Sequence, residues 1–263
     1  MTTNDHHTQI TAALGGLAAE APTSLMSKVF ARWVSAPSSL GDVFVAFTGA
    51  GVQFLRPAAD TDSIDGTDAI ATFAKAYRKR FARPLMPAQK PPAGLLPTLR
   101  GRPARALEFD LSPLTDLEQA VLAATRRIPP GQARPYSWVA REAGNPGAVR
   151  AVGSVLARNP VPLLVPCHRV VRADGALGQY IFGSAQKEQL LREEGVNVDE
   201  VADLANHGVH YLASDTTNIV CFPTCSDARR ITPQHRHEFG TLAQAFEAGY
   251  RPCQHCRPAV VAA

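Results

Sequence analysis

The sequence predicts a mixed α/β protein in three parts: an N-terminal α/β domain, a helical domain and a small four-cysteine module. Three observations support this division. Short β-type runs surround a TGAG turn in DVFVAFTGAGVQFLRP, a pattern typical of a hairpin. Helical runs follow one another between positions 114 and 158. Four of the five cysteines lie in two close pairs near the C-terminus.

The size and composition are those of a globular protein. The chain has 263 residues, enough for two or three small domains, with 45% hydrophobic and 19% charged residues. No run is long and apolar enough to span a bilayer. The N-terminal sequence has no basic segment ahead of its mild apolar run, which argues against a secretory signal. We therefore expect a cytoplasmic protein with reduced thiols.

The first part of the chain combines strand and helix signals. Residues 1–24 are rich in Ala, Gly and Thr, and we expect a flexible tail there. The N-terminal α/β domain is predicted to span residues 25–111, with the hairpin followed by a helix at Asp68–Ala82. The proline-rich segment PLMPAQKPPAGLLP predicts an irregular connector, and Ala106–Ser112 predicts a further strand.

The second part, residues 112–200, is predicted to be mainly helical. Leu114–Ile128 is a helical run, and Thr115 followed by Glu118 predicts a capping box at its start. Lys187–Glu194 predicts another short helix.

Two short helical segments, Tyr136–Ala143 and Gly147–Arg158, flank the break GNP, a spacing typical of a helix-turn-helix. This region is also basic, since Glu142 is the single acid between Val121 and Arg172. The local charge suits a polyanion such as DNA, although a solvated basic face would look the same. The arginines in this window are Arg126, Arg127, Arg134, Arg141, Arg150, Arg158, Arg169 and Arg172.

Cys167 stands apart from the other cysteines, in NPVPLLVPCHRVV. An apolar run leads to it, and His168 and Arg169 follow directly. Neighbouring basic groups lower a thiol pKa, and an adjacent histidine could take the thiol proton. An inert core cysteine would also fit an isolated position after an apolar run.

The surrounding sequence resembles the O6-alkylguanine-DNA alkyltransferase family. The motifs IPxG, Tyr, RAVG, NP, PCHRV and K-x-x-LL-x-x-EG occur in the family's order, and PCHRV is its acceptor-cysteine motif. The resemblance implies an RNase H-like N-terminal domain and a winged-helix-like helix-turn-helix domain. It also implies a single-turnover methyltransferase that moves an alkyl group from O6-alkylguanine, or O4-alkylthymine, in DNA onto its own thiol.

The resemblance also assigns catalytic roles. Cys167 matches the alkyl acceptor, His168 the base that acts through a water, and Glu194 the acid that orients the imidazole. Asn159 matches the hinge between the recognition helix and the active-site segment. Tyr136 matches the tyrosine that contacts the target base and its 3′ phosphate.

Further residues match the family's DNA contacts. Arg150 matches the arginine finger that fills the space left by an extruded nucleotide. The target nucleotide has to be flipped out because O6 of guanine is hidden in the base stack. Ala148, Val149 and Gly153 are small residues on the same predicted helix, which enters the minor groove in the family. Tyr180 matches a retained tyrosine of the base pocket. Taken alone, Arg150 would equally suit a phosphate contact or a solvated charge.

One departure from the family lies next to Tyr180. Ile181 and Phe182 replace smaller residues, and we expect both to border the base pocket. A bulkier wall predicts poorer acceptance of O6-benzylguanine than of O6-methylguanine.

The third part, residues 207–258, has too little apolar sequence for a core of its own, so we expect a structural metal. Its cysteines follow the pattern C-x-x-x-C, 27 residues, C-x-x-C, which predicts a tetrahedral zinc site better than disulfides. The predicted Zn²⁺ ligands are Cys221, Cys225, Cys253 and Cys256. The rival ligands nearby are His235, His237 and His255.

This part resembles the Ada-type zinc domain through TTNIVCFPTC and AGYRPCQHCRP. The resemblance makes Cys221 a second candidate methyl acceptor, from a DNA methylphosphotriester. Two residues depart from the family: Asn218 replaces a glycine and Phe222 replaces an arginine. The module also follows the guanine-repair domain instead of preceding it.

Three alternatives stay open beside repair at Cys167. The module could be a structural zinc knob that only helps hold DNA. A non-catalytic damage sensor would lack the acceptor cysteine, whereas Cys167 is present with His168 and Glu194. A transcriptional regulator would need an AraC-type segment, which the sequence lacks. We expect a monomer whose partner is alkylated double-stranded DNA, with no membrane and no obligate protein partner.

Overall fold

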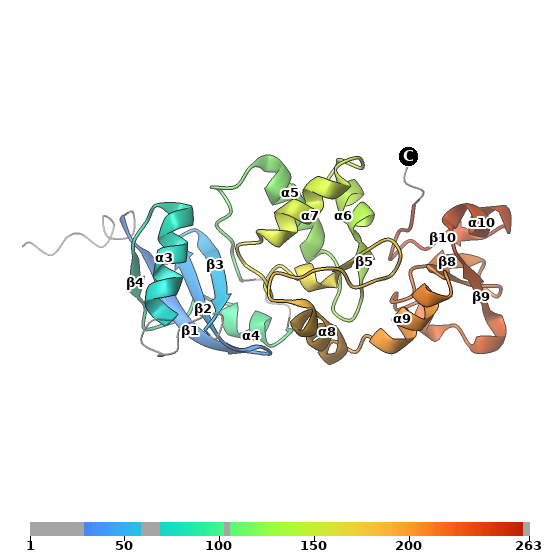
Figure 1. Cartoon of the computed structure of the whole chain (residues 1–263), viewed down its shortest axis with the longest axis horizontal. Coiled ribbons are helices and arrows are strands. Elements are labelled where there is room, and N and C mark those ends of the chain that lie inside the picture. The colour runs from blue at the N-terminus through green and yellow to red at the C-terminus, as the bar shows by residue number, and fades with distance from the viewer. Residues whose placement is uncertain (1–28, 59–68, 103–105, 260–263) are drawn as a thin grey trace, which may run out of the picture.

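The computed structural model describes residues 29–58, 69–102 and 106–259. The molecule is elongated, with the N-terminal sheet at one end, a helical middle and the cysteine module at the other end (Figure 1). The tail predicted for residues 1–24 lies outside the described residues. Among those described, no helix has the length and apolar character needed to cross a membrane.

The N-terminal sheet has the strand order β3-β2-β1-β4, formed by β1 (Ala31–Ser38), β2 (Gly41–Thr48), β3 (Gly51–Pro57) and β4 (Leu85–Pro87). The first three strands are antiparallel, and β4 runs parallel to β1. The predicted hairpin is confirmed as β2–β3, closed by the pair Thr48 and Gly51. Gly51 has a φ of 139°, and a Cβ there would lie 2.5 Å from the backbone of Glu108, so the turn requires glycine.

Helix α3 (Ala69–Phe81) packs on this sheet, where the sequence predicts a helix at Asp68–Ala82. Its buried Phe73 lies 5.5 Å, between ring centroids, from both Phe44 of β2 and Phe54 of β3. This aromatic cluster is separate from the larger core that extends into the middle of the molecule.

Two sequence predictions for this domain are wrong, and one strand is missed. The first strand of the sheet, β1, is not predicted at all. The proline-rich connector contains β4 and the short helix α4 (Leu95–Leu99). The predicted strand Ala106–Ser112 makes only an isolated bridge between Phe109 and Val52, because the segment meets the edge of β3 at one point and then leaves it.

The middle of the chain is helical, as predicted. Thr115 and Glu118 form the predicted capping box of the first helix. A two-stranded parallel pair joins the segment before α6 to the segment after Cys167. The elements are α5 (Asp116–Arg126), β5 (Arg134–Pro135), α6 (Tyr136–Glu142), α7 (Val149–Ala157), β6 (Val170–Val171) and α8 (Ser184–Glu193).

Helix α9 (Val198–Asn206) connects the middle to the cysteine module. The module's sheet has the order β10-β8-β7-β9. Its own core is small, with Ala213, Val220, Leu242 and Ala245 as the buried members. The four cysteines belong instead to the large core that continues from the middle of the chain. The remaining elements are β7 (Tyr211–Ser214), β8 (Ile219–Cys221), β9 (Arg236–Phe239), α10 (Leu242–Glu247) and β10 (Arg251–Pro252).

Candidate functional site

Cys167 begins a single 3₁₀ turn (Cys167–Arg169) and is 5% exposed. The fully buried Asn159 holds this turn in place. Its Nδ2 donates to the Val165 carbonyl (3.0 Å) and to Sγ of Cys167 (3.2 Å), while its Oδ1 accepts from the backbone N–H of Val161 (3.0 Å). One amide side chain therefore links the end of α7 to the turn that carries the thiol.

The surroundings of Cys167 favour the neutral thiol at rest. Burial raises its pKa to about 11, against the opposing effects of Asn159 and the cation of Lys187. Lys187 is itself fully buried on α8, and burial lowers its pKa to about 8. Its Nζ donates to the Val170 carbonyl, three residues after the thiol. A proton acceptor is therefore needed to form the thiolate.

His168 and Glu194 lie together, with Nε2 of the histidine 2.9 Å from Oε1 of the carboxylate. Arg169 donates to both carboxylate oxygens, at 2.9 Å through Nε and 2.7 Å through Nη2. The backbone N–H of Gly131 donates to Oε2 of Glu194 at 3.0 Å. The carboxylate thus has several fixed donors.

This network sets the protonation states of its members. Burial raises the pKa of Glu194, but the hydrogen bonds from His168 and Arg169 outweigh it and bring the value to about 2. Burial lowers the pKa of His168 more than Glu194 raises it. The histidine is therefore neutral at rest beside an ionised carboxylate. Its Nδ1 is buried without a hydrogen-bond partner among the described residues, which leaves that nitrogen available to accept a proton.

A cavity of about 530 Å³ opens beside Cys167. Tyr136 and Tyr180 both line it, as does Ile181. Phe182, expected at the same wall, packs edge-on against the Tyr180 ring, with 5.4 Å between centroids, and does not line the cavity. Two tyrosine side chains and an aliphatic side chain thus line the cavity.

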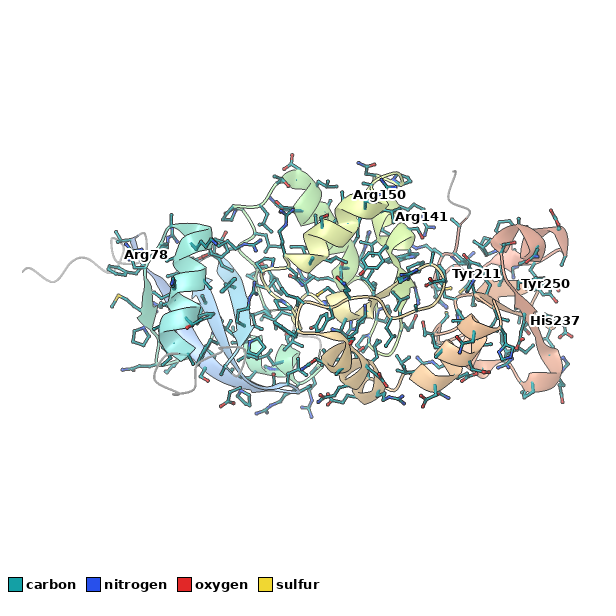
Figure 2. The ribbon with its side chains drawn as sticks, in the orientation of Figure 1. Arg78, Arg141, Arg150, Tyr211, His237 and Tyr250 are labelled. Atoms are coloured by element: carbon teal, nitrogen blue, oxygen red, sulfur yellow. The ribbon has the colours of Figure 1, made fainter. Side chains whose placement is uncertain are left out.

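The predicted DNA-contacting residues lie at the start of α7. Ala148 precedes the helix and Val149 begins it, while Arg150 is exposed and extends from the upper edge of the molecule in Figure 2. Gly153 lies three residues further on and lines the cavity. Residues three apart share a helix face, so Arg150 and the cavity lie on one side of α7.

The four cysteines of the module form a cluster that fits a metal ion. All four are buried, and their sulfur atoms lie within 4.8 Å of one another. A zinc ion with bonds of about 2.3 Å would hold tetrahedral sulfurs roughly 3.8 Å apart. All-thiolate ligand sets are typical of structural zinc.

The three histidines considered as rival ligands lie outside this four-cysteine cluster. His235 and His237 contact the carboxylate of Asp215 at 2.9 and 3.3 Å. His255 contacts Asp227 at 2.6 Å, and the two lie with Cys253 in a second, smaller group.

Sequence reasoning missed the roles of three basic residues. Arg169 fixes Glu194, Lys187 places a buried cation near the thiol, and Arg134 is buried beside the cysteine module. The first two belong to the PCHRV and K-x-x-LL motifs, so the motifs themselves carried a signal. Arg134 lies outside the motif positions, and its burial depends on contacts distant in sequence.

Two family models match the chain. Residues 116–196 match the 6-O-methylguanine DNA methyltransferase, DNA binding domain, and residues 200–259 match the metal binding domain of Ada.

Relatives match over limited lengths. The bifunctional transcriptional activator/DNA repair enzyme Ada of Escherichia coli is 47% identical over 83 residues, which is 32% of this chain and 23% of that protein. The methylated-DNA–protein-cysteine methyltransferase of Methanothermobacter thermautotrophicus is 43% identical over 98 residues, 35% of this chain and 54% of that protein. The chain thus spans about half or less of these relatives. The O6-methylguanine methyltransferase structure from Mycobacterium tuberculosis is 30% identical with a TM-score of 0.48, covering 62% of this chain and 92% of that one.

The chain therefore contains a domain of the guanine alkyltransferase class followed by a metal-binding module. It belongs to the O6-alkylguanine-DNA alkyltransferase family and carries an Ada-type zinc-binding domain behind the alkyltransferase part. Its cofactor is zinc. The ligands are the four clustered cysteines, Cys221, Cys225, Cys253 and Cys256.

Proposed function

We propose that the protein repairs DNA by moving an alkyl group from O6 of guanine, or O4 of thymine, onto Sγ of Cys167. The observation that carries this proposal is a buried thiol at a cavity, next to a histidine held by an ionised carboxylate. The related proteins named methylated-DNA–protein-cysteine methyltransferase support it. The thioether product is stable, so each molecule acts once.

The geometry supports a displacement in which His168 accepts the thiol proton at Nδ1, through a water. The sulfur then attacks the alkyl carbon, the S–C bond forms as the C–O bond breaks, and guanine leaves with the electron pair. Glu194, held by Arg169, stabilises the imidazolium that results. The leaving guanine takes up a proton. Asn159 acts as the hinge that positions the sulfur.

The target base would enter the cavity between Tyr136 and Tyr180 after leaving the duplex. Arg150 would occupy the gap in the stack, and Ala148, Val149 and Gly153 would allow α7 to approach the minor groove. In this arrangement α6 and α7 form a winged-helix-like unit within residues 112–200, and residues 25–111 form an RNase H-like domain. We further propose a cytoplasmic monomer that acts on double-stranded DNA.

The zinc module, residues 207–258, supports a second candidate function. Cys221 lines a cavity of about 500 Å³ together with Thr216 and Arg230, and none of the other three cysteines lines it. We propose that Cys221 accepts a methyl group from a methylphosphotriester there. Zinc keeps its four thiolate ligands deprotonated and nucleophilic at neutral pH. In the alternative, the module is a structural knob that holds DNA.

Mass spectrometry after reaction tests both sites. The full chain is incubated with duplexes that contain either O6-methylguanine or a methylphosphotriester, digested, and searched for a methyl adduct on each cysteine peptide. We expect the guanine lesion to label Cys167, with no label there in Cys167→Ala. An unlabelled Cys167 in the folded, zinc-loaded protein would refute the main proposal. An unlabelled Cys221 would favour the structural knob.

A further inference from the structure

Arg134 is a buried cation at the start of β5, in the alkyltransferase part of the chain, and is 1% exposed. Its guanidinium donates to the carbonyl of Ala133 at 2.7 Å and to the side chain of Gln132. Its Nε has no hydrogen-bond partner in the described part of the chain. Among the described residues no carboxylate forms an ion pair with it. A buried charge without a partner is strongly destabilising, so an anion is needed nearby.

The zinc module faces this guanidinium. The ring of Phe222, which follows Cys221, has its centroid 5.5 Å from the guanidinium carbon. Burial lowers the pKa of Arg134, and the electrostatic effect of the four cysteines, Cys256 first, opposes that shift. Four thiolates on one Zn²⁺ carry a net charge of about −2. The cation and the cluster are thus buried on opposite sides of one domain boundary.

The zinc-ligand loops also rest directly on the alkyltransferase part. The indole Nε1 of Trp138 in α6 donates to the carbonyl of Cys256 at 2.9 Å. The hydroxyl of Thr224, between the first two cysteines, accepts from the N–H of Ala133 (2.8 Å) and donates to its carbonyl (3.0 Å). These bonds join Ala133 and Trp138, which flank Arg134 in the sequence, to the zinc-ligand loops.

A partly buried carboxylate completes the contact between the two parts of the chain. Glu142, at the end of α6, has a side chain 9% exposed and pairs with Arg127 and Arg141, each at 3.2 Å, and with Arg257, the residue after Cys256. Arg141 in turn donates to the Arg257 carbonyl. The last zinc ligand is therefore held by helix α6 rather than by the module alone.

We propose that Arg134 is the counter-ion of the zinc–thiolate cluster, so that the alkyltransferase part completes the metal site of the module. The proposal rests on zinc binding and does not require alkyl transfer at either cysteine. Arg134 acts as a positioning residue that stabilises the cluster's charge without ligating the metal. Its strand β5 pairs with Val170 and Val171, so the same strand joins the cluster to the segment that follows Cys167.

Zinc retention tests this assignment. The zinc-loaded full chain is mixed with excess chromogenic chelator, and zinc release is followed by absorbance for wild type and Arg134→Met. Removing a residue that supports the metal ligands weakens metal binding by about 10- to 100-fold. We expect Arg134→Met to release zinc faster than wild type by a factor in that range. The matched control is Arg236→Met. Arg236 also bridges to a residue outside the module, Glu200 at 3.2 Å, and the bridge is partly exposed. The control should release zinc at the wild-type rate.

Charge and shape are separated by further variants. Arg134→Lys keeps the cation, so its zinc release should lie closer to wild type than that of Arg134→Met. In a Cys221→Ser background the cluster charge falls to about −1, and the relative effect of Arg134→Met should shrink. Wild-type zinc retention in Arg134→Met, or equal losses in the Met and Lys variants, would overturn the proposal. If Arg134→Met does not fold, Arg134→Gln replaces it in the same comparison.

Discussion

Replacing Glu194 with glutamine tests the network around Cys167 most directly. The change keeps the shape of the side chain but removes the negative charge of the carboxylate, to which both Arg169 and His168 are hydrogen-bonded. The pKa of Glu194 falls from 4.5 to about 2 on folding. At 1.36 kcal/mol per unit, the ionised form contributes about 3 kcal/mol to stability at neutral pH. The side chain of Glu194 is 18% exposed, so little of this is screened by solvent.

The sign of the pH dependence follows from the lowered pKa. The contribution is complete above pH 4.5 and is lost as pH falls through the folded value of about 2. At pH 3 about 2 kcal/mol of it should already be gone, which leaves about 1.4 kcal/mol. Glu194→Gln should therefore be about 3 kcal/mol less stable than wild type at pH 7, and the difference should narrow in acid.

Urea unfolding followed by tryptophan fluorescence measures this difference. The chain has two tryptophans, so a Trp33→Phe background leaves Trp138 of the alkyltransferase part as the reporter. Both proteins lose zinc alike in acid, and the comparison between them removes that effect. A difference that stays constant from pH 7 to pH 3, or one below about 1 kcal/mol at pH 7, would refute the assignment of an ionised, hydrogen-bonded Glu194.

Three further predictions concern the reaction. Because the pKa of Cys167 is about 11, its reaction with iodoacetamide should rise about tenfold per pH unit between pH 7 and 10; a plateau near pH 8 would contradict the raised value. Arg150→Ala should slow methyl transfer from an O6-methylguanine duplex far more than benzyl transfer from free O6-benzylguanine, as measured by the two adduct masses; equal slowing would place Arg150 outside base extrusion. Ile181→Gly should raise the rate with O6-benzylguanine relative to O6-methylguanine, since Ile181 lines the cavity, while Phe182→Leu should change that ratio little.

Local patterns in the sequence predict much of the helical middle. The pair Thr115 and Glu118 correctly places the start of α5, because a capping box involves only residues three apart. The positive φ of Gly51 is equally local, whereas the close approach of Glu108 to it is not. The strand β1 and the single bridge at Phe109 depend on which segments meet in space, and no local signal specifies that.

The candidate site shows the same contrast. The motif around Cys167 predicts that His168 and Glu194 act together. In the structure, Nε2 of His168 lies 2.9 Å from Oε1 of Glu194. The assigned roles stay predictions until adducts are measured. In the sequence, Arg134 is only one of several arginines in a basic region, and Glu142 is only the single acid of that region. Their partners in the cysteine module, Phe222 and Arg257, lie roughly 90 and 115 residues away, and the sequence does not specify where that module is placed.

The contact through Trp138 and Thr224 has a consequence for dissecting the protein. A chain cut within α9 would leave the indole N–H of Trp138 and the backbone groups of Ala133 without their partners across the boundary. The two fragments expressed separately should therefore recognise each other in solution, with zinc in the C-terminal fragment strengthening their affinity. The boundary behaves as a complementary interface within one chain, and fragment complementation would measure its strength.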